Sequence, residues 1–136
     1  MKKIACLVVV VFAFAMMFST SAFSARKTII RIGINAPMTG DIPKVGEGSK
    51  YAAMLWLEDI EKAGGLEVGG KKYEVDLVIE DNESKAESAV KANTKMITQD
   101  DVLAIIGPQS SKQAIPAGEV ANKYKTVMIS PWSTNP

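Results

Sequence analysis

The 136-residue sequence contains no histidine, and its single cysteine, Cys6, lies near the amino terminus. The absence of histidine removes the usual imidazole base, histidine-dependent catalytic triads and most zinc and iron sites. Charge is nearly balanced, with 16 Lys and Arg against 15 Asp and Glu, and the sequence contains no basic run or stripe. Nucleic acids and anionic membrane surfaces are therefore poor candidates as partners.

The first 24 residues are predicted to be a secretory signal peptide. Lys2 and Lys3 precede an apolar run over residues 4–18, and small residues follow it. This order is typical of an exported precursor that is cleaved between residues 22 and 25. The run of about 15 residues is short of the ~20 that span a bilayer. Because Cys6 stands at the start of the run and not at its end, we expect no lipid anchor.

The remaining chain, residues 25–136, alternates strand-like and helix-like segments. Apolar and β-branched residues predict strands over residues 28–35, 73–79, 102–106 and 126–129. Helical spacing predicts helices over residues 49–63, 84–97 and 111–124. The order β-α-β-α-β-α-β predicts a three-layer α/β fold with a mostly parallel sheet. The continuous apolar run over residues 102–106 is expected to be covered on both faces.

Three loops follow predicted strand ends, at the edge of the sheet where such folds bind ligands. They are residues 36–48, 107–111 and 130–136, and all are rich in Gly, Pro, Ser and Thr. Ser110 and Ser111 begin a predicted helix, whose free N–H groups and positive dipole end suit a carboxylate. Helix capping is the alternative role, since Ser110 and Gln113 have capping-box spacing, as do Ser84 and Glu87.

Other kinds of site are disfavoured. The first loop lacks both the G-x-G-x-x-G and the phosphate-loop patterns, and residues 107–111 lack the second glycine of a nucleophile elbow. Asp81 and Glu83 with Glu80 are interpreted as an acidic loop before a helix, because no calcium-loop pattern accompanies them. We expect no catalytic residue, no metal and no cofactor.

Five segments, in order, resemble the branched-chain amino-acid binding proteins of ABC transporters, the leucine/isoleucine/valine type. They are IGINAPMTGDIPKVGEG (32–48), EDIEKAGG (58–65), VIEDNESKAESAV (78–90), AIIGPQSS (104–111) and ISPWSTNP (129–136). The resemblance implies the type I periplasmic binding protein fold, with two α/β lobes that hold a ligand between them. It also implies that residues 25–136 are the N-terminal part of lobe 1, with an exposed face where later elements pack, and that the second lobe is absent.

The resemblance assigns ligand contacts to individual residues. A serine in the Gly-x-x-Ser-Ser segment takes the ligand's carboxylate, and this position falls on Ser111, with Ser110 beside it. Trp132 and Ser133 are expected to provide backbone contacts. The hydroxyl of Thr134 is expected to contact the ammonium or carboxylate group.

Two positions leave the identity of the ligand open. Val45 stands where leucine-type members carry a tyrosine over the ligand side chain, and Trp132 replaces a small residue. Trp132 either narrows the pocket, or lies over an apolar or aromatic ligand, or turns outward against the missing lobe.

The expected function is that of a periplasmic solute-binding protein. It would capture an amino acid or amide-like small molecule by lobe closure and deliver it to the membrane subunits of an ABC permease. One alternative is a ligand-sensing receptor ectodomain of the same fold. The other is an exported Rossmann-like enzyme with its catalytic residues further along the chain.

Overall fold

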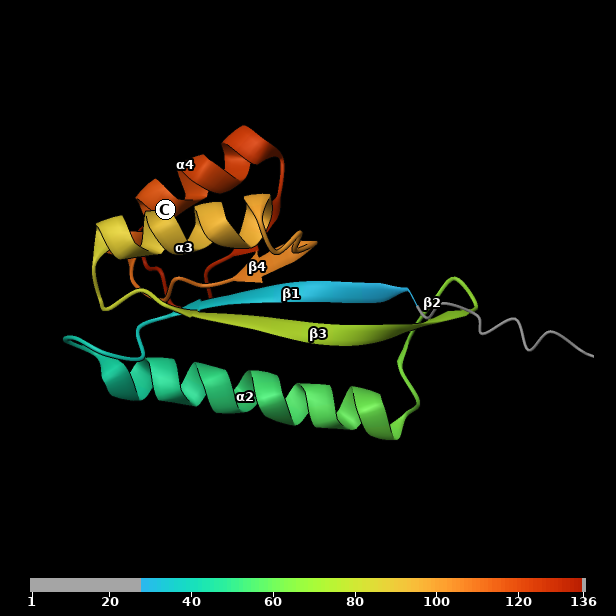
Figure 1. Ribbon diagram of the computed structural model, residues 1–136. Helices are drawn as coiled ribbons and strands as arrows, with labels where there is room; N and C mark the ends of the chain where they lie inside the picture. The colour runs from blue at the N-terminus through green and yellow to red at the C-terminus, as the bar shows by residue number, and fades with distance from the viewer. Residues whose placement is uncertain (1–27, 136) are drawn as a thin grey trace, which may run out of the picture.

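The computed structural model describes residues 28–135, so the predicted signal peptide and Cys6 lie outside the described residues. The elements in chain order are β1 (Ile29–Ala36), α2 (Pro43–Lys62), β2 (Leu66–Val68), β3 (Lys71–Asp81), α3 (Ala86–Thr98), β4 (Ala104–Ile106), α4 (Ser111–Tyr124) and β5 (Val127–Ile129). Figure 1 shows α2 on one side of β1 and β3, and α3 and α4 on the other side. This arrangement confirms the predicted three-layer α/β fold.

The sheet has the strand order β2-β3-β1-β4-β5, and every neighbouring pair is parallel except β2 with β3. The central strand β1 pairs with β3, where Ala36 lies opposite Asp81. On its other side β1 pairs with β4, where Ile34 lies opposite Ile106. Because β3, β1, β4 and β5 run in one direction, their carboxyl ends lie at one edge of the sheet.

The most deeply buried apolar contacts lie between the sheet and α3. Met96 of α3 is fully buried and belongs to a cluster with Ala92, Val102 and Ile105. Gly33 of β1 faces this cluster, because a Cβ atom there would lie 2.6 Å from the Met96 sulfur. Glycine therefore lets α3 approach the sheet closely. Burial of a side chain as large as methionine contributes about 1.5–3 kcal/mol to folding.

Three fully buried asparagines join the carboxyl ends of β1 and β3 to the helices. Asn35 Nδ2 donates to Asn93 Oδ1 at 2.8 Å and to the Ala89 carbonyl at 3.0 Å. Asn82 Nδ2 donates to Asn35 Oδ1 at 2.8 Å, and Asn93 Nδ2 donates to the Ala117 carbonyl at 2.9 Å. Because an unpaired buried amide is costly, this asparagine network fixes α3 and α4 against the strand ends.

Helix α2 begins at Pro43, six residues before the predicted start at residue 49. Proline is tolerated in the first turn of a helix, where its missing N–H has no intrahelical partner. Gly46 packs so closely on the preceding loop that a Cβ atom would lie 2.1 Å from the Pro37 carbonyl oxygen. The proline and glycine that suggested a long loop therefore belong to the first turns of the helix.

The antiparallel hairpin of β2 and β3 was not predicted. Its turn contains Gly69 and Gly70, whose φ angles of 59° and 76° favour glycine. Leu66 pairs with Tyr73, so the hairpin extends β3 at the amino-terminal side of the predicted strand. Three-residue strands of this kind carry too little periodic pattern to be recognised in a sequence.

The predicted capping box at Ser84 is wrong. The N-cap of α3 is Lys85, and it has no side-chain capping hydrogen bond. Ser84 has a φ of 58°, and its hydroxyl donates to the Thr39 carbonyl at 3.0 Å and accepts from Ile42 N–H at 3.3 Å. The serine therefore connects two loops and does not cap the helix.

Strands β4 and β5 present an uncovered apolar surface on the α2 side of the sheet. Ile106 lies opposite Ile129, and alternation along β5 places Val127 on the same face. The side chains of Ile106, Ile129 and Val127 are 41%, 62% and 61% exposed, respectively. The prediction that residues 102–106 are covered on both faces is wrong for the described part of the chain. The expected exposed apolar face is observed here.

Candidate ligand-binding site

Three loops lie at the edge of the sheet where the parallel strands end, as the sequence predicted. They are residues 37–42 after β1, residues 107–110 after β4 and residues 130–135 after β5. Gly107 N–H donates to the Ile129 carbonyl at 2.8 Å, and the Ser130 hydroxyl donates to the Pro108 carbonyl at 2.5 Å. These hydrogen bonds hold the second and third loops side by side.

Ser110 is the N-cap residue of α4, but its side chain makes no capping hydrogen bond. Its carbonyl instead accepts hydrogen bonds from Gln113 N–H at 3.0 Å and Ala114 N–H at 2.8 Å. The predicted capping box between Ser110 and Gln113 is therefore wrong, although the helix begins where it was predicted. The hydroxyl of Ser110 is not committed to the helix.

Ser111 and Ser133 form a hydroxyl pair at the first turn of α4. Their Oγ atoms lie 2.9 Å apart, and Asn135 N–H donates to Ser111 Oγ at 3.2 Å. Both serines are half-buried. A helix N-terminus adds unpaired N–H donors and a positive partial charge, so the hydroxyl pair lies in a setting that favours an anion such as a carboxylate.

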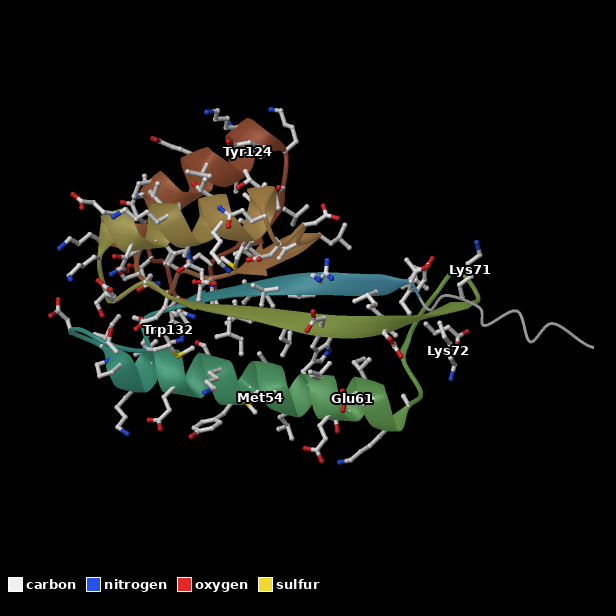
Figure 2. All side chains as sticks on the ribbon, viewed as in Figure 1. Met54, Glu61, Lys71, Lys72, Tyr124 and Trp132 are labelled. Atoms are coloured by element: carbon white, nitrogen blue, oxygen red, sulfur yellow. The ribbon has the colours of Figure 1, made fainter. Side chains whose placement is uncertain are left out.

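Val45 and Trp132 line one pocket beside this hydroxyl pair. The pocket has a volume of about 460 Å³, and the other lining residues are Lys44, Gly48, Ser49, Ala52 and Pro131. Its walls are mainly apolar, and Trp132 is 65% exposed. Figure 2 shows Trp132 near the first turns of α2, at the edge where β1 and β3 end. The pocket can therefore receive an apolar group from a ligand.

Thr134 lies between Trp132 and the end of the described chain, and it is exposed. Its hydroxyl makes no hydrogen bond to another residue within 28–135. The structure thus brings Ser111 and Ser133 together, places Val45 and Trp132 in one pocket, and leaves Ser110 and Thr134 with uncommitted hydroxyls.

Asp81 anchors the loop after β1. Its Oδ1 accepts hydrogen bonds from Met38 N–H, Thr39 N–H and Glu83 N–H at 2.8–3.2 Å, and its Oδ2 accepts from the Thr39 hydroxyl at 2.7 Å. Burial acts to raise the pKa of Asp81, but the hydrogen bonds from Thr39, Glu83 and Met38 outweigh it and hold the pKa below its usual value. In the acidic segment that contains Glu80, Asp81 and Glu83, Asp81 therefore has a structural role, because it holds the loop after β1.

Gln109 is a buried polar residue that the sequence did not indicate. Its Nε2 donates to Ser49 Oγ at 2.8 Å, and that hydroxyl donates to the Val45 carbonyl at 3.0 Å. This connection ties the loop after β4 to the first turns of α2, beneath the apolar pocket. A glutamine in a loop that contains Gly and Pro is ordinarily exposed, so no sequence signal marks it.

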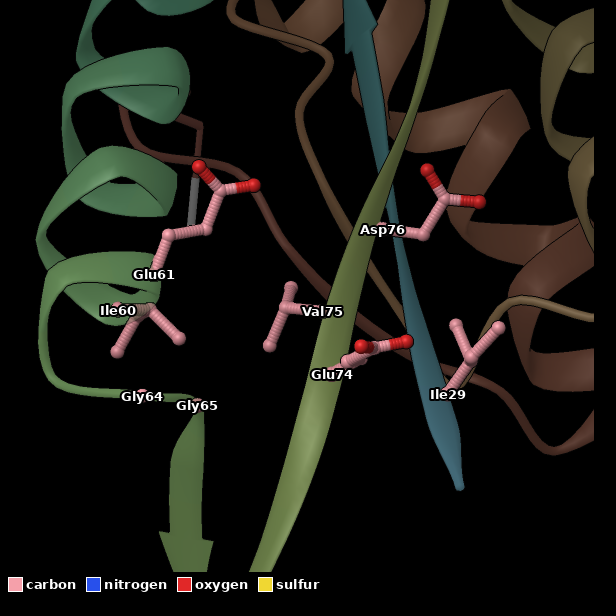
Figure 3. Close-up of a pocket in the computed structure, with 8 residues that line it drawn as sticks. All are labelled: Ile29, Ile60, Glu61, Gly64, Gly65, Glu74, Val75 and Asp76. Atoms are coloured by element: carbon pink, nitrogen blue, oxygen red, sulfur yellow. The ribbon is translucent and has the colours of Figure 1, made fainter. Parts of the chain in front are cut away.

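A second pocket lies at the other end of α2 and has a volume of about 450 Å³. Figure 3 shows three carboxylates around it, those of Glu61, Glu74 and Asp76. Asp76 pairs with Arg31 at 3.4 Å. Because this pocket borders the beginnings of β1 and β3, it lies away from the edge where the parallel strands end.

Within residues 28–135, no group of three or more Cys, Asp or Glu side chains is arranged to hold a metal ion. Among the same residues, no helix is both long enough and apolar enough to cross a bilayer.

Residues 29–136 match the family described as periplasmic binding protein, and the chain belongs to this family. The predicted family and fold are therefore confirmed.

Three relatives illustrate the similarity. An amino acid binding protein of Pseudomonas aeruginosa is 35% identical over 77% of this chain and 27% of its own length. The Leu/Ile/Val-binding protein BraC3 of Rhizobium johnstonii is 32% identical over 79% of this chain and 28% of its own length. The solved structure of LivJ, the branched-chain amino acid transporter substrate binding protein of Streptococcus pneumoniae, in complex with isoleucine, is 32% identical. It aligns with a TM-score of 0.73 over 80% of this chain and 30% of its own length.

The chain thus spans less than a third of the length of these relatives. Their descriptions name them as binding proteins and not as enzymes.

Proposed function

We propose that this chain forms part of the first lobe of an extracytoplasmic solute-binding protein that captures an amino acid or a similar small acid for an ABC importer. The observation that carries this proposal is the Ser111–Ser133 hydroxyl pair at the N-terminus of α4, beside an apolar pocket. The family match supports it, since the relatives include proteins described as binding branched-chain amino acids.

The two parts of the site correspond to the two parts of an amino acid. The ligand's carboxylate binds at the first turn of α4, where Ser111, Ser133 and the backbone N–H groups donate hydrogen bonds. Ser110 and Thr134 have hydroxyls that are free to add further contacts. The ligand's apolar group enters the pocket that Val45 and Trp132 line. Trp132 offers a flat face, which suits an apolar or aromatic side chain.

A second lobe completes the site in this proposal. The relatives are more than three times as long as the matched segment, and the described part of the chain leaves Trp132 largely exposed. Closure of two lobes around the ligand would cover Trp132 and supply acidic groups for the ligand's ammonium. The protein makes and breaks no bond, and the ligand shifts an open–closed equilibrium by its additional contacts in the closed state.

Export to the periplasm fits this function. The first 24 residues have the layout of a cleavable signal peptide, and the family is described as periplasmic. The partners in this proposal are the ligand and the membrane subunits of an ABC permease.

Titration calorimetry on the complete, processed protein tests the function. The panel is L-leucine, L-isoleucine, L-valine, L-phenylalanine and benzoate, with glucose as a ligand that lacks a carboxylate. The proposal predicts binding of at least one of the carboxylates and none of glucose. Binding of glucose, with no heat from any carboxylate, contradicts it.

A further inference from the structure

The apolar pocket of the proposed site lies between two walls that come from separate parts of the chain. The helix wall is the first half of α2, where Val45, Ser49 and Ala52 recur at helical spacing. The loop wall is the segment after β5, which contributes Pro131 and Trp132. The distance between these two walls is the width that a ligand's apolar group can occupy.

Apolar packing contributes little to this width in the described residues. Helix α2 packs mainly on β1 and β3. The side chains of Ile106 in β4 and Ile129 in β5 are 41% and 62% exposed on the side of the sheet that faces α2. The position of the loop wall relative to the helix wall therefore depends largely on polar contacts.

Gln109 provides a polar connection between the two walls. Its Nε2 donates to Ser49 Oγ at 2.8 Å, and this hydroxyl donates to the Val45 carbonyl at 3.0 Å. The residue before it, Pro108, has a carbonyl that accepts from the hydroxyl of Ser130, which directly precedes the loop wall. Hydrogen bonds therefore run from the helix wall, through residues 108–109, to the loop wall.

The surroundings of Gln109 indicate that its amide does more than fill space. The side chain is 2% exposed, and its Oε1 is buried and accepts no hydrogen bond within residues 28–135. A buried acceptor without a donor lowers stability, and an apolar side chain of the same length would avoid this loss. What the amide adds at this position is its hydrogen bond to Ser49.

We propose that Gln109 is a positioning residue that sets the width of the apolar pocket and thereby selects the size of the ligand's apolar group. This inference rests on the proposed function, because it assigns a role within the same ligand site. Gln109 acts through Ser49, which lines the pocket. Without this hydrogen bond the two walls can move relative to each other, so ligands of different size bind with more similar affinities.

Gln109→Met in the complete, processed protein tests this role, because methionine keeps an unbranched side chain and lacks the amide donor. Titration calorimetry uses the carboxylates named above, with L-alanine added as the smallest amino acid. A pocket of fixed width distinguishes ligands that differ by one methylene by about tenfold or more. We expect the wild type to show such size selectivity. In Gln109→Met, the ratio between the tightest and the weakest affinity should fall by about fivefold or more.

Stability measurements separate positioning from a general effect on folding. Urea denaturation of Gln109→Met should give a midpoint equal to or above that of the wild type, because no buried acceptor is left without a donor at this position. Gln99→Met is the matched control, since it makes the same substitution at an exposed glutamine that directly follows α3. Its affinity ratio should equal that of the wild type.

Ser49→Ala removes the same hydrogen bond from the other side. If Gln109 acts through Ser49, the double variant Gln109→Met/Ser49→Ala should reduce the affinity ratio no more than Gln109→Met does alone. Additive effects of the two substitutions would mean that they act independently, and would overturn the proposal.

Two further results overturn the role of Gln109 and leave the proposed function intact. One is a Gln109→Met variant that binds the panel with the selectivity of the wild type. The other is a wild type that binds the carboxylates with equal affinity whatever their size. A wild type that binds none of the carboxylates contradicts the proposed function itself, and the role of Gln109 with it.

Discussion

The two helical layers of this lobe bury their residues to different degrees. Helix α3, with 13 residues, buries Ala89, Ala92, Asn93 and Met96, whereas α2, with 20 residues, buries only Gly46. The α3–α4 layer combines the apolar cluster with the asparagine network. The α2 layer rests on half-buried contacts and carries exposed apolar groups outward. Stability is therefore concentrated on the α3–α4 side of the sheet, and the α2 side has exposed apolar side chains such as Tyr51 and Leu55.

The largest expected effect comes from the apolar cluster. Met96→Ala removes a fully buried side chain from a site where the surrounding backbone can close only partly. We expect the free energy of unfolding to fall by about 2–5 kcal/mol, measured by urea denaturation. Ile115→Ala is the control on the same layer, because Ile115 is 52% exposed on α4. A loss from Met96→Ala no larger than that from Ile115→Ala would show that the α3–α4 layer is not the stable one.

The second-largest loss of stability is expected from a substitution in the asparagine network. Asn93→Ala deletes the donor to the Ala117 carbonyl and the acceptor that Asn35 uses. The stability loss should be about 1–3 kcal/mol, because buried partners are left without hydrogen bonds. Asn122→Ala, at an exposed position of α4, should stay within about 0.5 kcal/mol of wild type. If the two substitutions lowered the free energy of unfolding equally, the asparagine network would not be a source of stability.

A smaller and pH-dependent effect is expected at Asp81. Its folded-state pKa is depressed, so its contribution to stability is present above the unfolded pKa of about 3.9 and is lost as pH falls through the folded value. Asp81→Asn should lower the free energy of unfolding by about 1 kcal/mol at pH 7. The difference in free energy of unfolding between Asp81→Asn and the wild type should disappear in strong acid. Asp41→Asn, at an exposed position of the loop after β1, is the control. A stability difference between Asp81→Asn and the wild type that does not change with pH would contradict a role for the ionised Asp81 carboxylate.

The smallest effect on stability is expected on the outer face of α2. Leu55→Ala removes a side chain that is 61% exposed, and the free energy of unfolding should change by less than about 0.5 kcal/mol. Urea denaturation of both proteins measures this change. A loss comparable to that of Met96→Ala would mean that α2 is covered within the protein and is not a free surface.

The fold was largely predictable because its elements carry periodic patterns. Alternating isoleucines mark β1, and an apolar helical period marks α4, where the predicted and observed limits agree. The failures occurred where tertiary contacts decide the outcome. Gly46 was predicted to lie in a loop, yet it lies in the first turns of α2, where only a residue without a side chain fits against Pro37. Ser84 was predicted to cap a helix, yet its hydroxyl donates to the carbonyl of Thr39, 45 residues away in the loop after β1.

The candidate site was predictable in part. Parallel strands place their loops at one edge, so the sequence could group residues 107–111 with residues 130–136, and the family resemblance pointed to Ser111 and residues 132–134 within them. It could not show that Ser111 and Ser133 contact each other, since their separation depends on the hydrogen bonds between the two loops. The role of Gln109 was not predicted, because burial of a polar side chain in a loop produces no recognisable sequence pattern.

The central claim is that the ligand's carboxylate binds at Ser111. Calorimetry on the complete protein tests it, with the tightest-binding amino acid of the panel and with the primary amide of that amino acid. Ser111→Ala should weaken binding of the amino acid by about 1–3 kcal/mol and affect the amide much less, because the lost hydrogen bond is made to the carboxylate. Ser88→Ala, at a half-buried serine of α3 whose hydroxyl donates to Glu83, should leave both affinities unchanged. An unaltered affinity of Ser111→Ala for the amino acid would contradict the account.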